Sequence, residues 1–141
     1  MIYERREMSE RSDSGVLDTC VYLDLGVLDP SVLPEIPEIT AVTLAELYQG
    51  VALAKDADSR ALRAEQLGAA VADFDALPFD QNAAARYGSL VARTVAAGRS
   101  PRPRRLDLMI AAIASTANLP LYTRNAADFA GLEGLVTVVE I

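Results

Sequence analysis

The chain contains no histidine and only one cysteine, Cys20, and this composition excludes several kinds of active site. Without histidine, Ser-His-Asp and Cys-His catalysis and histidine metal sites are excluded. One thiol cannot build a zinc site either. Carboxylates must therefore carry any hydrolytic reaction, and carboxylate oxygens favour hard cations such as Mg²⁺ or Mn²⁺. A lone cysteine also forms no internal disulfide, which fits a reducing compartment.

Long apolar runs and a secretion signal are lacking as well. The longest uninterrupted apolar run, residues 108–114, is far too short to cross a bilayer, and residues 3–14 are polar and of mixed charge. We therefore expect a cytoplasmic protein. A chain of 141 residues with 51% hydrophobic content is sufficient for one domain around one core. We expect a mobile tail at residues 1–14 and a folded domain at residues 15–141, with Met8 as an alternative natural start.

Basic residues are outnumbered, since 13 lysines and arginines face 20 acids and the net charge is -7. Long-range attraction of nucleic acid is therefore unfavourable, and any RNA contact needs a local basic patch. Four arginines within seven positions supply a candidate, and a fifth follows later: Arg99, Arg102, Arg104, Arg105 and Arg124. The alternative for the first four is a solvated loop stiffened by prolines.

The most apolar part of the chain is residues 106–117, where almost every position is apolar or small. A helix there would be apolar nearly all round and would lie at the centre of the core. Residues 119–123 follow as a short buried strand. Asp107 falls in the first turn of this helix, and Asp128 falls in a tight turn after the strand. Ionised groups at the edge of a core are costly unless they are paired or bound to a cation.

The remaining apolar patterns alternate between short strands and helices. We expect strands at residues 15–18, 38–42, 119–123 and 136–139, an edge-like element at 77–79, and helices beginning at Cys20, Thr43, Asp56, Asp80 and Leu106. The helices at 43 and 56 form an antiparallel pair. We interpret the aromatic residues Tyr48, Phe74, Phe79 and Phe129 as core rather than base-stacking residues. This alternation predicts an α/β sandwich with a parallel sheet.

Four acids fall near strand ends or helix starts at one expected edge of that sheet: Asp18, Glu46, Asp107 and Asp128. Each has a simpler alternative: Asp18 and Asp107 as helix caps, Glu46 as part of a Thr43-Leu44-Ala45-Glu46 capping box, and Asp128 as a turn residue. Together, however, the four carboxylates would repel one another. A bound Mg²⁺ or Mn²⁺ removes that repulsion, and it can activate water against a phosphodiester.

Four motifs, in order over residues 15–141, carry a resemblance to a known family. They are Val16-Leu17-Asp18-Thr19, Thr43-Leu44-Ala45-Glu46-Leu47, Asp107-Leu108-x-Ile110-Ala111-Ala112 and Thr123-Arg124-Asn125-x-x-Asp128-Phe129. The chain resembles the PIN-domain ribonuclease toxins of VapBC toxin-antitoxin pairs. The resemblance implies a three-layer α/β/α fold and Mg²⁺- or Mn²⁺-dependent cleavage of a structured RNA such as tRNA or rRNA. It also implies a homodimer and inhibition by a VapB-type antitoxin whose C-terminal segment occupies the groove.

Residue by residue, the resemblance assigns metal binding and catalysis to Asp18, Glu46, Asp107 and Asp128. It implies supporting or RNA-contacting positions at Thr19, Thr123 and Asn125, and we expect phosphate contacts at Arg104, Arg105 and Arg124. Cys20 departs from the family pattern, which often has a serine there. Two alternatives remain: a catalytically silent module that acts through its partner, and a phosphoacceptor receiver domain. The second needs a lysine after its last strand, whereas the only lysine here is Lys55.

Overall fold

A parallel sheet of four short strands forms the middle of the fold in the computed structural model, which describes residues 13–141. The strands are β1 (Ser14–Leu17), β2 (Ile36–Glu38), β3 (Leu121–Thr123) and β4 (Val138–Glu140), in the spatial order β2-β1-β3-β4. Every neighbouring pair is parallel. The expected tail at residues 1–14 lies outside the described residues except for its last two, and the second of these, Ser14, begins β1.

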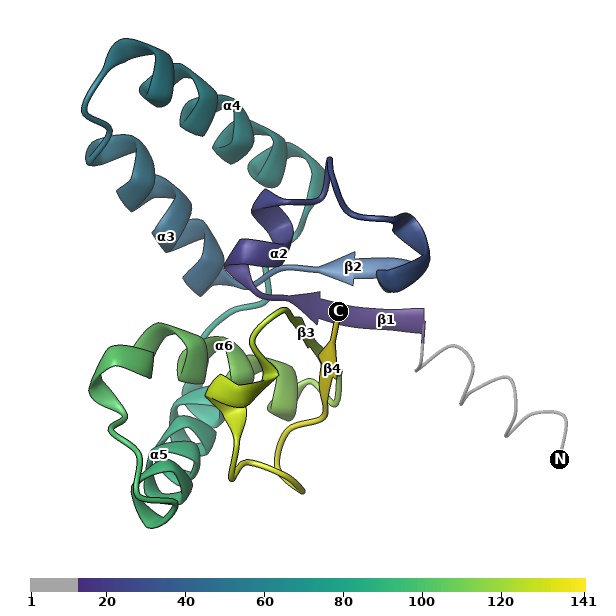
Figure 1. Ribbon diagram of the computed structural model, residues 1–141, viewed down its shortest axis with the longest axis vertical. Coiled ribbons are helices and arrows are strands. Elements are labelled where there is room, and N and C mark those ends of the chain that lie inside the picture. Colours follow the sequence, from purple (N-terminus) through teal and green to yellow (C-terminus); the bar gives the residue numbers. More distant parts are fainter. Residues whose placement is uncertain (1–12) are drawn as a thin grey trace, which may run out of the picture.

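Helices cover both faces of this sheet, as Figure 1 shows. On one side lie α2 (Thr19–Leu23), α3 (Ala41–Ala52) and α4 (Ala57–Asp73), and on the other lie α5 (Gln81–Ala96) and α6 (Arg105–Thr116). Three short 3₁₀ helices complete the described chain: η1 (Pro30–Val32), η2 (Arg102–Arg104) and η3 (Ala126–Phe129). The predicted three-layer α/β/α fold is confirmed. No helix within residues 13–141 has the length and apolar character needed to cross a membrane.

The helix α6 is the centre of the main core. Every residue from Ile110 to Ser115 is buried, as is Leu108, so the helix is enclosed on nearly all sides, as the sequence predicted. It packs with residues of α5 and with Val16 and Leu121 from the two central strands. A second, smaller cluster under α3 and α4 contains Tyr22, Ile39, Leu47 and Ala70. Burial of α6 therefore fixes its first turn against the sheet.

Helix α3 begins two residues earlier than the sequence predicted. The run of β-branched residues at 38–42 is not a strand, because β2 ends at Glu38 and the hydroxyl of Thr40 accepts a hydrogen bond from the Thr43 amide at 3.2 Å. Thr40, rather than Thr43, is thus the N-cap. The last strand is also displaced, to Val138–Glu140, while Val136 packs in the core before it.

The α3–α4 hairpin leaves the body and returns to it at one point. At that point Thr40 and Leu77 form an isolated parallel bridge, with the Leu77 amide donating to the Ile39 carbonyl at 2.9 Å and the Ala41 amide donating to the Leu77 carbonyl at 2.8 Å. The hairpin projects away from the sheet (Figure 1). Its surface carries apolar side chains that were expected to be buried, and the prediction of Tyr48 as a core residue is wrong because 57% of it is exposed.

The other three aromatic residues predicted to lie in the core are buried or partly buried. Phe129 is buried in the main core, and Phe74 and Phe79 are partly buried against the two clusters. The helix starts predicted at Asp56 and Asp80 are confirmed to within one residue. Both aspartates are N-caps, since Asp56 accepts from the Ser59 amide at 2.8 Å and Asp80 accepts from the Ala83 amide at 2.9 Å. These local signals are independent of tertiary packing, which explains why sequence alone identified them.

Candidate functional site

The carboxyl ends of the strands bring the four predicted acids into one neighbourhood. Asp18 directly follows β1, and Asp128 lies in η3 just after β3. Glu46 lies in α3, the helix that follows β2, and Asp107 lies in the first turn of α6. The charges of Asp18, Glu46 and Asp128 all act on the carboxyl of Asp107. Acids that are up to 110 positions apart in the sequence thus share one edge of the sheet.

Asp107 shows the strongest electrostatic effect in this neighbourhood. Burial is the largest cause that raises its pKa, from an ordinary 3.8 to about 6, and repulsion from Glu46, Asp18 and Asp128 adds to it. Arg104 acts in the opposite direction. The pKa of Glu46 is raised as well, chiefly by burial and further by the charge of Asp18, against a hydrogen bond that lowers it. Negative charge is therefore poorly compensated here, which is the condition that a bound cation relieves.

Asp18 combines a structural role with its place in the site. Only 9% of the residue is exposed, and its Oδ1 accepts a hydrogen bond from the Val21 amide at 2.8 Å, which caps α2. The capping role that the sequence suggested is thus real. It uses one oxygen of the carboxylate, so the cap fixes the side chain at the sheet edge without excluding a ligand on the second oxygen.

Glu46 does not form the capping box that its spacing from Thr43 suggested. Its Oε1 accepts a hydrogen bond from the hydroxyl of Thr19 in α2 at 2.8 Å. The Thr19 oxygen in turn lies 3.0 Å from the hydroxyl oxygen of Thr43. Because the true cap is Thr40, Glu46 lies farther into the helix than expected and reaches across to α2 instead of back to its own helix start. Thr19, a predicted supporting residue, therefore contacts one of the four acids.

A pocket of about 300 Å³ joins two of the four acids, Glu46 and Asp107, to the predicted basic loop. Its lining consists of Glu46, Asp107, Arg102, Pro103, Arg105 and Leu106. Arg104 lies next to it and donates to the Ser100 carbonyl at 2.9 Å, while Arg99 is engaged with the Ala127 carbonyl at 2.5 Å. Arg102 and Arg105 are exposed. Acids and arginines thus line the same small hollow.

The fourth motif, which begins at the last residue of β3, differs from expectation in its contacts. Arg124, predicted to contact phosphate, forms an ion pair with Asp24 at 2.9 Å, and the two side chains are 42% and 39% exposed. Thr123 is fully buried, and its hydroxyl accepts from the Asn125 amide at 3.0 Å. Thr123 therefore shapes the turn rather than offering a contact to RNA, whereas Asn125 is exposed.

The donors at this edge suit a hard cation, since they are carboxylates and hydroxyls with no imidazole. Within residues 13–141, however, no three acidic or cysteine side chains stand as a group that could hold a metal ion. The four acids therefore interact through their charges without converging on one point. Cys20 is largely exposed beside them, and its partial burial, together with the charges of Asp18, Asp107 and Glu46, raises the pKa of its thiol.

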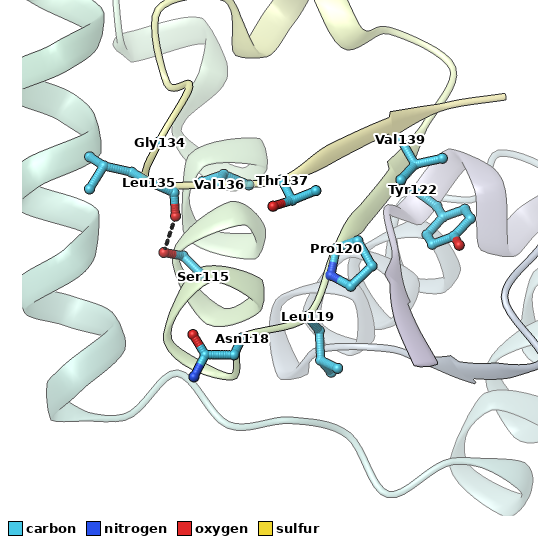
Figure 2. A pocket seen from close by; sticks show the side chains of 10 residues that line it. All are labelled: Ser115, Asn118, Leu119, Pro120, Tyr122, Gly134, Leu135, Val136, Thr137 and Val139. Atoms are coloured by element: carbon cyan, nitrogen blue, oxygen red, sulfur yellow. Dashed lines mark hydrogen bonds between the residues drawn. The ribbon is translucent and has the colours of Figure 1, made fainter. Parts of the chain in front are cut away.

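A larger hollow, of about 660 Å³, lies at the opposite end of the strands. Figure 2 shows it between the end of α6 and the segments that lead into β3 and β4. Its lining contains no charged residue: Ser115, Asn118, Leu119, Pro120, Tyr122, Gly134, Leu135, Val136, Thr137 and Val139. The Ser115 hydroxyl donates to the Leu135 carbonyl at 2.5 Å and accepts from Arg86. This hollow offers no acid and no base for hydrolysis.

Sequence reasoning missed one member of the acidic site, Thr43, which it treated as a helix cap. The signal that reveals its true place is the pair of threonines three residues apart, Thr40 and Thr43. The earlier one caps the helix, which leaves the later one inside the first turn with its side chain fully buried.

Comparison with known proteins gives the same result as the geometry. The chain matches no protein-family model. It is 40% identical to ribonuclease VapC5 of Mycobacterium tuberculosis (strain ATCC 25618 / H37Rv) over 134 residues. The aligned region covers 93% of this chain and 96% of that protein. The crystal structure of VapBC-5 from M. tuberculosis, a member of the VapBC family of toxin-antitoxin systems, has a TM-score of 0.78, at 40% identity, over 92% of this chain and 98% of that chain.

A more distant structure, FitAcB from Neisseria gonorrhoeae, has a TM-score of 0.71 at 28% identity and covers 89% of this chain and 96% of its own. Fold and acidic edge together define a PIN-type α/β/α protein. At the identity and coverage shared with VapC5, the chain belongs to the VapC family of ribonuclease toxins. The resemblance read from the four motifs is thereby confirmed.

Proposed function

We propose that this chain is the toxin of a type II toxin-antitoxin system and an Mg²⁺- or Mn²⁺-dependent endoribonuclease that cleaves a structured RNA, tRNA or rRNA. The observation that carries the proposal is Asp107, whose pKa is raised to about 6 by burial and by the charges of three other acids. The same acid lines a pocket with Arg102 and Arg105. Residues 15–141 form the proposed nuclease domain.

In this proposal Asp18, Asp107 and Asp128 hold the cation, directly or through water, and Glu46 completes the set or orients the attacking water. When bound, the cation supplies an activated water and stabilises the charge that develops on the phosphodiester. The chain's own contribution is placement. The cap on α2 fixes Asp18, the burial of α6 fixes Asp107, and the hydrogen bond from Thr19 fixes Glu46.

The arginines around the pocket hold backbone phosphates in this proposal. Arg102 and Arg105 are exposed and line the pocket, and Arg104 acts on Asp107 through its charge. Their guanidinium groups suit phosphate oxygens, and the patch is local enough to act within a chain of net charge -7. Arg124 joins them by exchanging Asp24 for a phosphate. Exposed ion pairs contribute little free energy, so this exchange is easy.

The proposed partners follow from the same site and from the relatives. The similar structure of VapBC-5 is of a member of the VapBC family of toxin-antitoxin systems. We therefore propose that a VapB-type antitoxin binds this chain and that its arginine-bearing C-terminal segment occupies the acidic groove. We also propose that the toxin forms a homodimer. The proposed compartment is the cytoplasm, where the RNA substrate and the antitoxin are made.

Cleavage of a total tRNA and rRNA pool by the purified protein tests the function. We expect cutting with Mg²⁺, none with EDTA, and none by Asp107→Asn, whereas Asp75→Asn, an exposed acid in a loop, cuts like the wild type. Thermal unfolding with and without Mg²⁺ adds a readout that needs no RNA. Mg²⁺ should raise the melting temperature of the wild type and of Asp75→Asn but not of Asp107→Asn.

Two outcomes would contradict the proposal. Cutting that survives EDTA or Asp107→Asn would place the reaction elsewhere or in a contaminant. No cutting under any condition, with no effect of Mg²⁺ on unfolding, would favour the silent module that acts only through its partner.

A further inference from the structure

Thr43 differs from Thr94 and Thr116, the threonines of α5 and α6, in where its hydroxyl points. In α5 the buried Thr94 donates to the carbonyl of Leu90, four residues earlier, at 2.8 Å, and in α6 Thr116 donates to Ala112 at 3.1 Å. This bond to the carbonyl four residues back is the usual solution for a threonine inside a helix. The hydroxyl of Thr43 instead lies 3.0 Å from that of Thr19, on another helix.

The start of α3 explains the difference. The carbonyl four residues before Thr43 belongs to Ile39, which precedes the N-cap Thr40 and is therefore outside the helix. That carbonyl already accepts the amide of Leu77 at 2.9 Å. The Thr43 side chain is fully buried, so its hydroxyl needs a protein partner, and the partner it finds is Thr19.

The direction of the hydrogen bonds follows from the number of hydrogens. An ionised carboxylate only accepts, so the single hydrogen of the Thr19 hydroxyl is given to Glu46 Oε1, 2.8 Å away. The hydrogen between the two threonines must then come from Thr43. The result is a one-way chain from Thr43 to Thr19 to Glu46. Reversing it would leave Glu46 without its donor.

We propose that Thr43 is a positioning residue of the acidic site, which orients the Thr19 hydroxyl and through it holds the carboxylate of Glu46 toward Asp107 and the arginine-lined pocket. Thr43 touches neither substrate nor metal and acts only through Thr19. This inference rests on the proposed function for its effect on cleavage. The hydrogen-bond chain itself is independent of that function.

Three variants separate the hydroxyl from the packing of the side chain. Thr43→Val keeps the volume and removes the hydroxyl, Thr43→Ser keeps the hydroxyl and removes the methyl group, and Thr94→Val makes the same change at a buried threonine of α5 outside the site. We expect Thr43→Val to lower the cleavage rate about 10- to 100-fold and to weaken Mn²⁺ binding, measured by calorimetric titration of the protein alone. Thr43→Ser should recover most of both losses, and Thr94→Val should change neither.

A crystal structure of Thr43→Val tests the inference without any activity. We expect the Thr19 hydroxyl to turn away and the contact with Glu46 to be lost. An intact contact together with wild-type cleavage would overturn the proposal, and so would a Thr43→Ser protein as impaired as Thr43→Val, since packing would then be the cause. If Thr43→Val does not fold, Thr43→Ala and Thr43→Ser form the comparison. If the wild type neither binds Mn²⁺ nor cuts RNA, the proposed function fails, while the structure of the variant still decides the role of Thr43.

Discussion

The two ends of the parallel sheet carry hollows that differ in size and, more sharply, in the charge of their lining residues. At the carboxyl end a pocket of about 300 Å³ is lined by two acids and two arginines among its six residues. At the amino end a hollow of about 660 Å³ is lined only by uncharged residues (Figure 2). The larger hollow thus has no carboxylate and no basic side chain among the described residues that line it. In this fold, uncompensated charge marks the candidate site better than size does.

The same strands and the same helix α6 contribute to both ends. The start of α6 carries Asp107, whose pKa is raised by burial and by its acidic neighbours. The far end of α6 carries Ser115, whose hydroxyl both accepts and donates a hydrogen bond. At the amino end the buried Ser115 hydroxyl therefore has hydrogen-bond partners on both sides. At the carboxyl end the negative charge of Asp107 lacks sufficient compensation. Substitutions at the amino end should change stability, and substitutions at the carboxyl end should change activity.

The largest expected effect comes from Asp18. Asp18→Asn keeps the cap on α2, because asparagine is an equally good N-cap, but removes the charge. We expect RNA cleavage to fall by about 100-fold or more with little loss of stability. Asp18→Ala removes both, so it should lose the same activity and also about 1 kcal/mol of unfolding free energy. Cleavage assays and urea unfolding measure the two losses. An active Asp18→Asn protein would break the assignment of function to the carboxyl end.

Gly15 tests the amino end, next to Tyr122. A Cβ at this position of β1 would lie 2.7 Å from Tyr122 Cδ1 and 3.2 Å from the Cβ of Pro34, too close for carbon atoms. Gly15→Ala should therefore lower the unfolding free energy by about 1 to 3 kcal/mol as the ring is displaced. Denaturant unfolding measures this loss, and Gly88→Ala, where a new Cβ meets nothing within 4 Å, is the control. Equal stability of the two variants would show that the ring yields freely.

Ser115 gives a smaller effect of the same kind. Ser115→Ala leaves the Leu135 carbonyl without its donor and Arg86 without its acceptor, which should lower the unfolding free energy by about 1 to 2 kcal/mol. Specific RNA cleavage should be unchanged once the protein is folded. Ser89→Ala, at an exposed position of α5, provides the comparison for unfolding. A marked loss of cleavage with normal stability would give the amino end a functional role and break the contrast.

The smallest effect is a pH dependence of stability. The pKa of Asp107 is about 6 in the folded protein and 3.8 as its ordinary value, so the fold disfavours the ionised form. Its penalty is present above about pH 6 and disappears as the pH falls toward 3.8. Asp107→Asn should therefore melt a few degrees higher than the wild type near neutral pH, and this advantage should shrink on acidification. A difference in melting temperature that stays constant with pH would contradict the raised pKa.

Much of the fold could be predicted from the sequence because its signals are local. The apolar run of α6, the helix starts at Asp56 and Asp80 and the strand that ends before Asp18 each depend on a few adjacent residues. The gathering of the four acids could also be anticipated, since parallel strands place their carboxyl ends on one edge. The sequence thus indicates which edge of the sheet carries the acids, but not the hydrogen bonds that Asp18 and Glu46 form there.

The failures have specific physical reasons. Residues 38–42 have the β-branched character of a strand, but the hydroxyl of Thr40 starts a helix there, and the choice depends on β2 ending at Glu38. The pairing of Arg124 with Asp24 joins residues a hundred positions apart, and no local pattern announces it. Tyr48 follows the apolar spacing of α3, yet no element within residues 13–141 packs over it, and 57% of the residue is exposed.

The bridge between Thr40 and Leu77 fastens the base of the α3–α4 hairpin to the rest of the domain. Its two ends are joined by main-chain hydrogen bonds at the sheet, whereas its far end projects into solvent (Figure 1). Glu46 lies near the anchored end, only five residues from the start of α3. The distal turns can therefore lengthen, shorten or diverge in sequence between relatives without moving the acid that the hairpin contributes.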